Sequence, residues 1–174
     1  MTAATLHAAP NRLQRQLERL KEAPALVRPW VRNIVLRRAV PFTGTAGLRF
    51  ITMEPGKVEI AIANERRVQN HIGGVHASAM NLLAETATGM VVGMNVRDDC
   101  LPLAKELRMQ FRKRATGGLR AVATLSDAQR AAMQASDKGE VNVSVTVTDE
   151  AGVNPVECEF IWAWIPSGPR RSET

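Results

Sequence analysis

The chain has 174 residues, of which 45% are hydrophobic and 23% charged, and it has neither an internal repeat nor a low-complexity block. These values indicate one globular domain with a substantial core. Two cysteines exclude a disulfide framework or a cysteine-based metal site, and no run reaches the roughly 18 apolar residues of a membrane span.

The net charge points toward anionic partners. Lysine and arginine number 23 against 17 aspartates and glutamates, which gives +6 and a pI near 10.1. Such an excess favours nucleic acid, anionic lipid or a phosphate-bearing small molecule. Free thiols and the lack of an apolar secretory core at the N-terminus indicate the cytoplasm as the location.

Residues 1–40 predict a helical extension after a disordered start over residues 1–10. Leucines recur at helical spacing between Asn11, a plausible N-cap, and Glu22, and Pro24 ends the run. A second helix is predicted from Pro29 to about Arg38. Its expected docking face consists of Trp30, Val31, Ile34 and Val35.

Strand signals begin after Pro41 and Gly44, which are expected to break the helical pattern. The runs 48–53 and 57–63 flank a Glu-Pro-Gly connection and predict a hairpin. Polar residues 64–69 then form a loop that leads to a Gly-rich turn.

The stretch from Asn70 to Met94 organises the chain. Its Gly pair suits a sharp turn, and residues 75–94 are good helix formers with almost no polar face, which predicts a buried helix. Glu85 is the single charged side chain between His76 and Arg97. A carboxylate in apolar surroundings is costly to ionise, so Glu85 is expected to have a raised pKa and a function.

The second half of the chain is predicted to be mostly strand. Apolar and polar residues alternate in four runs, and residues 126–136 between the second and third runs are predicted as a short helix. The four runs cover residues 107–111, 119–125, 141–147 and 156–164. Short connections favour antiparallel pairing, and one apolar helix needs a sheet to enclose it.

The expected fold class is therefore α+β: a curved antiparallel sheet wrapped around one long central helix, with extra N-terminal helices. This arrangement resembles the hotdog fold. The pattern of Asn70, His76 and Glu85 within Leu-Leu-Ala-Glu-Thr-Ala resembles the signature of phenylacetic-acid-pathway-type acyl-CoA thioesterases. The Gly-Val-His-Ala sequence and the helix at 126–136 are similar to those of an uncharacterised thioesterase-like hotdog subgroup.

The expected organisation is a helical extension over 1–40, a hotdog domain over 41–166 and a disordered tail over 167–174.

The resemblance implies roles for particular residues. Glu85 would activate water or attack the thioester carbonyl, His76 and Asn70 would shape the turn or contact the substrate, and backbone N–H groups at the helix start would polarise the carbonyl. Coenzyme A enters as part of the substrate, and no metal or other cofactor is implied. The substrate-binding candidates are Gly74, Val75, Ala77, Ser78, Arg66, Arg67, Arg112, Lys113 and Arg114, the last five for the phosphates of coenzyme A.

Nine helical residues separate His76 from Glu85, which places them roughly 13 Å apart along the helix and on opposite faces. A shared site therefore requires two antiparallel copies of the helix in a homodimer, with pairing into a tetramer left open. Ala77 and Ser78 replace the usual glycines after the histidine, so a non-catalytic acyl-thioester binder is an alternative. A basic nucleic-acid-binding protein is a third, less favoured alternative, and nucleic acid is not expected as a partner, because tyrosine is absent and the tryptophans lie in patterns that look internal. A membrane partner is not expected either, because no run is long and apolar enough to span one.

Overall fold

A computed structural model describes residues 9–168, in which five α-helices and six strands follow one another along the chain. The predictions of disorder for residues 1–10 and 167–174 fall mostly outside this range. The helices are α1 (Arg12–Lys21), α2 (Arg28–Ala39), α3 (Pro41–Ala46), α4 (Ala77–Gly93) and α5 (Asp127–Ala135), and a 3-10 turn spans Arg66–Val68. The strands are β1 (Arg49–Glu54), β2 (Lys57–Ile62), β3 (Cys100–Phe111), β4 (Leu119–Thr124), β5 (Gly139–Asp149) and β6 (Val156–Pro166).

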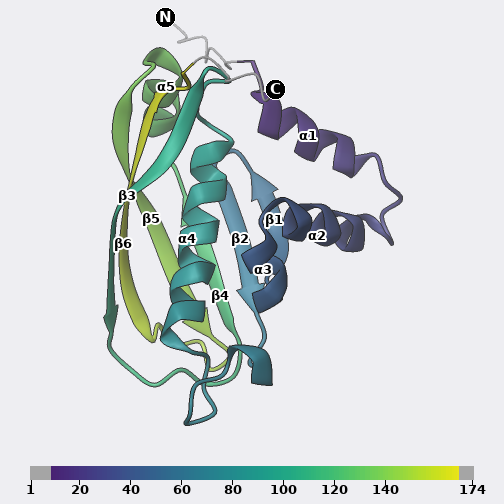
Figure 1. Cartoon of the computed structure of the whole chain (residues 1–174), viewed down its shortest axis with the longest axis vertical. Coiled ribbons are helices and arrows are strands. Elements are labelled where there is room, and N and C mark those ends of the chain that lie inside the picture. Colours follow the sequence, from purple (N-terminus) through teal and green to yellow (C-terminus); the bar gives the residue numbers. More distant parts are fainter. Residues whose placement is uncertain (1–8, 169–174) are drawn as a thin grey trace, which may run out of the picture.

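The six strands form one antiparallel sheet in the order β1-β2-β4-β5-β6-β3. The sheet curves around α4, which lies along its concave face, while α1, α2 and α3 gather beside β1 (Figure 1). This arrangement confirms the predicted fold class, and α4 occupies the span expected for the central helix.

The core lies between α4 and the sheet. Leu83, Ala84, Ala87 and Val91 of α4 are fully buried, as are Ile60 and other inward side chains of the sheet. Small residues on α4 let the sheet approach closely. Burial of apolar surface at roughly 25 cal/mol per Å² makes this interface the main source of stability.

Helix α2 covers the β1 edge of the sheet with polar side chains. Asn33 Oδ1 accepts a hydrogen bond from Phe50 N (2.8 Å), and Arg32 Nη2 donates to Phe50 O (2.6 Å). Farther along, Arg37 Nε donates to Leu48 O (2.7 Å). These contacts satisfy backbone groups that an edge strand would otherwise expose, and so they protect β1 from pairing with another chain.

The predicted docking face of α2 was wrong at Trp30 and Val35, whereas Val31 and Ile34 are half-buried. Trp30 is 68% exposed and Val35 is 42% exposed, whereas Leu36 is buried and the side chains of Arg32 and Asn33 reach β1. Hydrogen bonding to the sheet edge, rather than apolar contact, sets the rotation of this helix. The expectation that all three tryptophans are internal fails at Trp30, while Trp162 and Trp164 are buried.

The expected break before Pro41 is present, since α2 ends at Ala39, but the helical pattern resumes at once, because Pro41 and Gly44 belong to α3. Pro41 is the first residue of that helix, where its fixed φ fits and its missing N–H costs nothing. Gly47, with φ of 73°, ends the helix in the left-handed conformation that glycine favours. Strand β3 begins seven residues before the predicted run, since its edge position tolerates Pro102.

The two cysteines lie on neighbouring strands, Cys100 on β3 and Cys158 on β6. Cys158 pairs with Met109 and Cys100 pairs with Pro166, so the two thiols lie toward opposite ends of the β3–β6 ladder and cannot bond. Burial raises the pKa of the Cys158 thiol to about 11. Among residues 9–168, no helix combines the length and apolar character needed to cross a bilayer.

Candidate functional site

The turn that precedes α4 is held together by Asn70. Its Oδ1 accepts hydrogen bonds from Ile72 N and Gly74 N, each at 3.1 Å, and its backbone N–H donates to Gly74 O (2.8 Å). Gly73 has a φ of 76°, which a side chain would strain. Asn70 is thus placed to shape the turn, and its side-chain oxygen is committed to that role.

His76 caps α4. It has extended backbone angles, and its Nδ1 accepts a hydrogen bond from Ser78 N (3.0 Å), as an N-cap side chain does. Its own backbone N–H donates to Val68 O (2.7 Å). Since Nδ1 is the acceptor, neutral His76 carries its proton on Nε2.

At the start of α4, the backbone N–H of Ala77 is left without a hydrogen-bond acceptor among the described residues. The N–H groups of Ser78, Ala79 and Met80 bond to His76, whereas that of Ala77 has no partner within the described part of the chain. An unpaired N–H at a helix N-terminus attracts partial negative charge. It is therefore suited to receive a polarised carbonyl oxygen.

One face of α4 is open, which corrects the expectation of a helix buried all round. Ser78, Asn81 and Glu85 recur at helical spacing and line an open groove of about 550 Å³. Ala77, Leu82, Phe42 of α3, and Met109 and Phe111 of β3 complete its wall. The groove is mostly apolar, with the carboxyl of Glu85 toward one end.

Glu85 is half-buried in this groove, and no salt bridge to it is found among residues 9–168. Burial raises the pKa of its carboxyl above the ordinary value. This matches the shift expected from the sequence. A carboxyl with a raised pKa in an apolar groove is suited to accept a proton.

The apolar wall of the groove comes from the inner face of β3. Leu107 and Phe111 pair with Phe160 and Val156, which face the core, so the alternation seen in the sequence does point these side chains inward. The side chains of Leu107 and Phe111 remain 40% and 55% exposed because β3 is the edge strand opposite β1. A strip of apolar side chains thus stands uncovered beside Glu85.

The structure does not bring His76 and Glu85 together within one chain. His76 lines a neighbouring cavity of about 240 Å³, shared with Arg67, Phe42 and Ser78, whereas Glu85 lines the groove. Phe42, Ser78 and Leu82 border both spaces, so the two hollows adjoin. From Ala77 to Glu85 the rise of an α-helix amounts to about 12 Å.

The five basic candidates divide into two groups. Arg66 and Arg67 lie in the 3-10 turn, and Arg67 pairs with Glu65 (2.6 Å). Arg112 pairs with Glu157 (2.8 Å) at the end of β3. Arg114 Nη2 donates to Ile72 O (3.0 Å), which brings the 112–114 segment to the turn before α4. Lys113 is exposed beside it.

The other two candidates before the helix, Gly74 and Val75, lie in the turn that precedes α4, and Val75 is buried.

Sequence reasoning missed Asn81 and the aromatic wall. Asn81 precedes Glu85 by four residues and follows Ser78 by three, so helical spacing alone was enough to place all three on one face. Phe42 could not be found this way, because its helix was not expected. No cluster of three or more potential metal ligands occurs among the described residues.

Several solved structures resemble this fold, and thioesterases are among them. A crystal structure from Pseudomonas aeruginosa, described as a protein of unknown function and probable thioesterase, is 25% identical with a TM-score of 0.71, and the match covers 78% of this chain and 93% of that one. A thioesterase from Haemophilus influenzae is 12% identical with a TM-score of 0.60, covering 75% and 86%. A mutant thioesterase from Staphylococcus aureus is 16% identical with a TM-score of 0.61, covering 73% and 100%.

The fold is therefore hotdog-like. A search of the curated proteins found no significant match. A family model described as "Domain of unknown function (DUF4442)" matches residues 29–165, a span that includes all but the first residue of α2, all but the last residue of the sheet, the groove and Glu85. The chain belongs to this DUF4442 family, with a hotdog, thioesterase-like structure.

Proposed function

We propose that this protein hydrolyses the thioester of an acyl- or aryl-coenzyme A. The observation that carries the proposal is the pairing, in one groove, of a carboxyl whose pKa burial raises with an apolar strip beside it. The structural likeness to thioesterases supports the reaction class. The acyl group is proposed to lie against Met109 and Phe111.

The reaction needs an electrophile, a base and a leaving group. Ala77 N–H would donate to the thioester carbonyl oxygen and stabilise the negative charge that develops there. The Glu85 carboxylate would take a proton from a water molecule whose oxygen attacks the carbonyl carbon. The C–S bond then breaks, and the thiolate of coenzyme A takes the proton back from Glu85, which yields a carboxylic acid and free thiol.

The spacing of these two groups supports a homodimer. About 12 Å of helix rise separates Ala77 from Glu85, whereas a water held by the carboxylate must lie within about 3–3.5 Å of the carbonyl carbon. Two α4 helices placed antiparallel by a two-fold axis would bring Glu85 of each chain to the helix start of the other. The uncovered strip of β3 is the surface we propose to be buried in this dimer.

The phosphates of coenzyme A are proposed to bind the basic residues around the turn. Arg114 and Lys113 lie next to the turn, and Arg67 lies beside His76. Guanidinium groups match phosphate oxygens well. Surface pairs such as Arg112–Glu157 are weak, so a phosphate can replace the carboxylate at little cost.

A non-catalytic binder of acyl thioesters is the second candidate. It is favoured by the occupied N–H of Ser78, which bonds to His76 and leaves one free donor at the helix start. A single donor stabilises the transition state less than two. Binding without turnover is what this candidate expects.

The test is a thiol-release assay across straight-chain, branched and aryl-coenzyme A thioesters, with binding measured in parallel by calorimetry. Our proposal expects saturable turnover for at least one class. Binding across the panel with no turnover would establish the second candidate. A folded protein that neither binds nor hydrolyses these compounds would contradict both.

A further inference from the structure

A further cavity, separate from the groove and from the cavity beside His76, lies between α1, α2 and β1. Its volume is about 170 Å³, and its lining comes from the ends of the two helices and the β1 strand. Leu17 and Met53, both buried, form an apolar floor, and Glu54 stands at its border. Nothing in the proposed hydrolysis uses this space.

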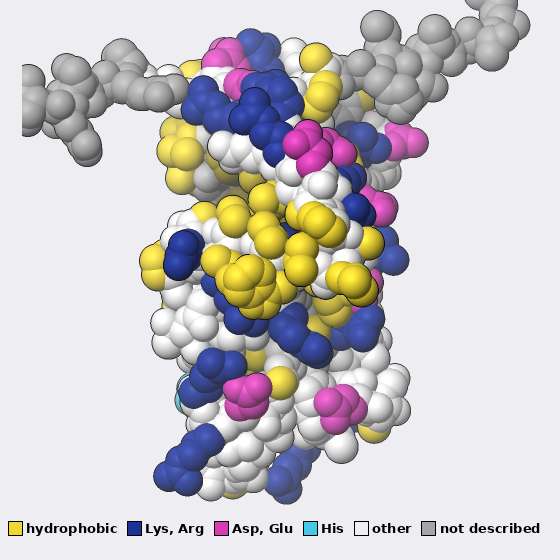
Figure 2. Space-filling view, turned by 90° about the vertical axis from the view of Figure 1, so that its right-hand side faces the viewer, with side chains coloured by type: hydrophobic (Ala, Val, Ile, Leu, Met, Phe, Trp, Pro, Cys, Tyr) yellow, Lys and Arg dark blue, Asp and Glu magenta, His cyan; other side chains and the backbone are white. Residues whose placement is uncertain are grey.

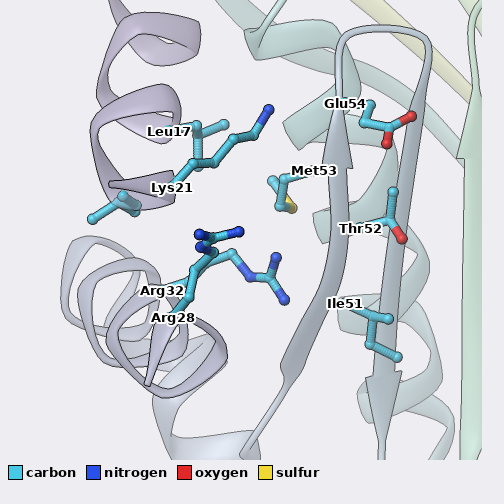
Figure 3. A pocket seen from close by; sticks show the side chains of 9 residues that line it. Leu17, Lys21, Arg28, Arg32, Ile51, Thr52, Met53 and Glu54 are labelled. Carbon is cyan, nitrogen blue, oxygen red and sulfur yellow. The ribbon is translucent and has the colours of Figure 1, made fainter. Parts of the chain in front are cut away.

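Three cationic side chains converge on it. Figure 3 shows Lys21 of α1 and Arg28 and Arg32 of α2 reaching into the space that faces Met53. Lys21 pairs with Glu18 at the surface (2.6 Å), and Arg28 Nε donates to Ala23 O (3.2 Å). Neither Arg28 nor Arg32 forms an ion pair within residues 9–168. Glu54 is the single carboxylate among the lining residues and forms no ion pair with these three side chains within residues 9–168, so the cavity keeps an excess of positive charge.

Arg32 supplies an independent indication of a ligand. Its Nη2 donates to Phe50 O, but its Nε is buried and has no hydrogen-bond partner among the described residues. A buried donor without a partner costs about 1–3 kcal/mol, more when it is charged. Burial also lowers the pKa of the Arg32 guanidinium, which is the response of a cation that lacks a counter-charge.

The size and charge of the cavity define the chemistry it fits. Since one water occupies roughly 30 Å³ of liquid, the space holds a group of a few heavy atoms, not a nucleotide. A phosphate group carries two negative charges and offers several acceptor oxygens to Arg and Lys. We infer that the cavity between α1, α2 and β1 binds a phosphate monoester through Arg32, Arg28 and Lys21.

Such a phosphate has two sources, a small soluble molecule or a lipid headgroup. On the face that carries α1 and α2, hydrophobic side chains gather among Lys and Arg (Figure 2). Leu26, Val27 and Trp30, which are 97%, 44% and 68% exposed, lie in and just before α2. Exposed apolar side chains beside basic ones also occur on surfaces that contact anionic membranes, so the experiment needs an arm for each source.

The experiment measures binding of inorganic phosphate and glycerol 3-phosphate by calorimetry at constant ionic strength. Co-sedimentation uses phosphatidylcholine vesicles with and without phosphatidic acid. The variants are Arg32→Gln and the double variant Lys21→Gln/Arg28→Gln, whose two positions lie nearer the surface and so leave the edge contact to β1 intact. Arg38→Gln is the matched control, since it removes one exposed charge from α2 outside the cavity.

We expect saturable binding by the wild type, weakened about tenfold or more in both cavity variants and less than about twofold in Arg38→Gln. Binding confined to soluble phosphates identifies a soluble ligand, and added retention on phosphatidic acid vesicles identifies a lipid headgroup. No saturable binding in either arm, or an equal loss in Arg38→Gln, would overturn the inference. Thioester hydrolysis should be unchanged in the cavity variants, so this result is independent of the proposed function.

Discussion

Gly89 of α4 lies directly beneath the indole of Trp162, so closely that a Cβ at Gly89 would stand 2.7 Å from the ring. One residue earlier, Thr88 Oγ1 accepts a hydrogen bond from Trp162 Nε1 (3.0 Å). Together the two contacts fix β6 onto the central helix. A glycine in the middle of a helix is thus explained by the ring that it admits.

Replacing Gly89 with Ala should destabilise the protein. Alanine favours the helix by about 1 kcal/mol, but at 2.7 Å from a buried ring the overpacking lies at the severe end of about 1–3 kcal/mol. We expect a net loss of about 1–2 kcal/mol in the free energy of unfolding, measured by denaturant titration. Gly93→Ala is the matched control on the same helix: its Cβ would meet only the Leu13 methyl at 3.2 Å, so stability should be unchanged or raised. Equal losses in both variants would contradict the packing argument.

Glu85→Gln should separate catalysis from stability. As a general base, Glu85 is expected to contribute about a hundredfold or more to turnover, measured by thiol release. Because burial raises the pKa of the folded-state carboxyl, folding loses stability as pH rises from the unfolded-state pKa, about 4.3, through the folded-state pKa. The variant should therefore be more stable than the wild type at neutral pH and equal to it at lower pH. A less stable variant with turnover close to wild type would make Glu85 structural.

His76 is tested by two substitutions that differ in capping. His76→Ala removes the acceptor for Ser78 N–H and should cost about 1 kcal/mol of stability, whereas His76→Asn keeps an N-cap acceptor. If His76 acts by positioning the helix start, Asn should restore both the melting temperature and the turnover that Ala loses. Stability restored without turnover would show that the imidazole itself contacts the substrate.

Asp149 should govern part of the acid stability. Its carboxylate accepts hydrogen bonds from Thr116 N, Ala151 N and Val153 N at 2.9–3.0 Å, and these bonds lower its pKa below the ordinary value. Its stabilisation is therefore complete above the unfolded-state pKa, about 3.9, and is lost as pH falls through the folded-state pKa. Asp149→Asn should lose stability at neutral pH and show a flatter decline below pH of about 4 in thermal melts. A parallel decline in both proteins would contradict this role.

Much of the fold could be predicted because periodicity reports burial directly. The β5 and β6 runs alternate every second residue, and α4 has the small and apolar residues of a central helix. The orientation of α2 could not be predicted, since it depends on Arg32 and Asn33 bonding to the edge of β1, a contact between elements that periodicity does not record. The open face of α4 was missed because mostly small and apolar residues surround Asn81 and Glu85 in the sequence.

The candidate site was predictable in chemistry more than in geometry. The raised pKa of Glu85 followed from its apolar neighbours. For His76 and Asn70, shaping the turn and contacting the substrate were open alternatives, and the observed hydrogen bonds show how both residues shape it. The exposed strip of β3 depends on strand order, because Leu107 and Phe111 stay uncovered only at the edge of the sheet.

The central claim is that Ala77 of one chain and Glu85 of its partner form one site. Ala77→Pro removes the free N–H, and proline suits this first helical position because His76 already has extended angles, with φ −65° and ψ 144°. Each variant alone, Ala77→Pro or Glu85→Gln, should be folded and inactive. Mixed dimers of the two carry one intact site.

The decisive measurement is therefore thiol release by the two variants co-expressed with different affinity tags and purified as mixed dimers. We predict that activity returns to about half of the wild-type value per dimer, since one of two symmetric sites regains both groups. Mixed dimers as inactive as either parent would contradict a site shared between chains.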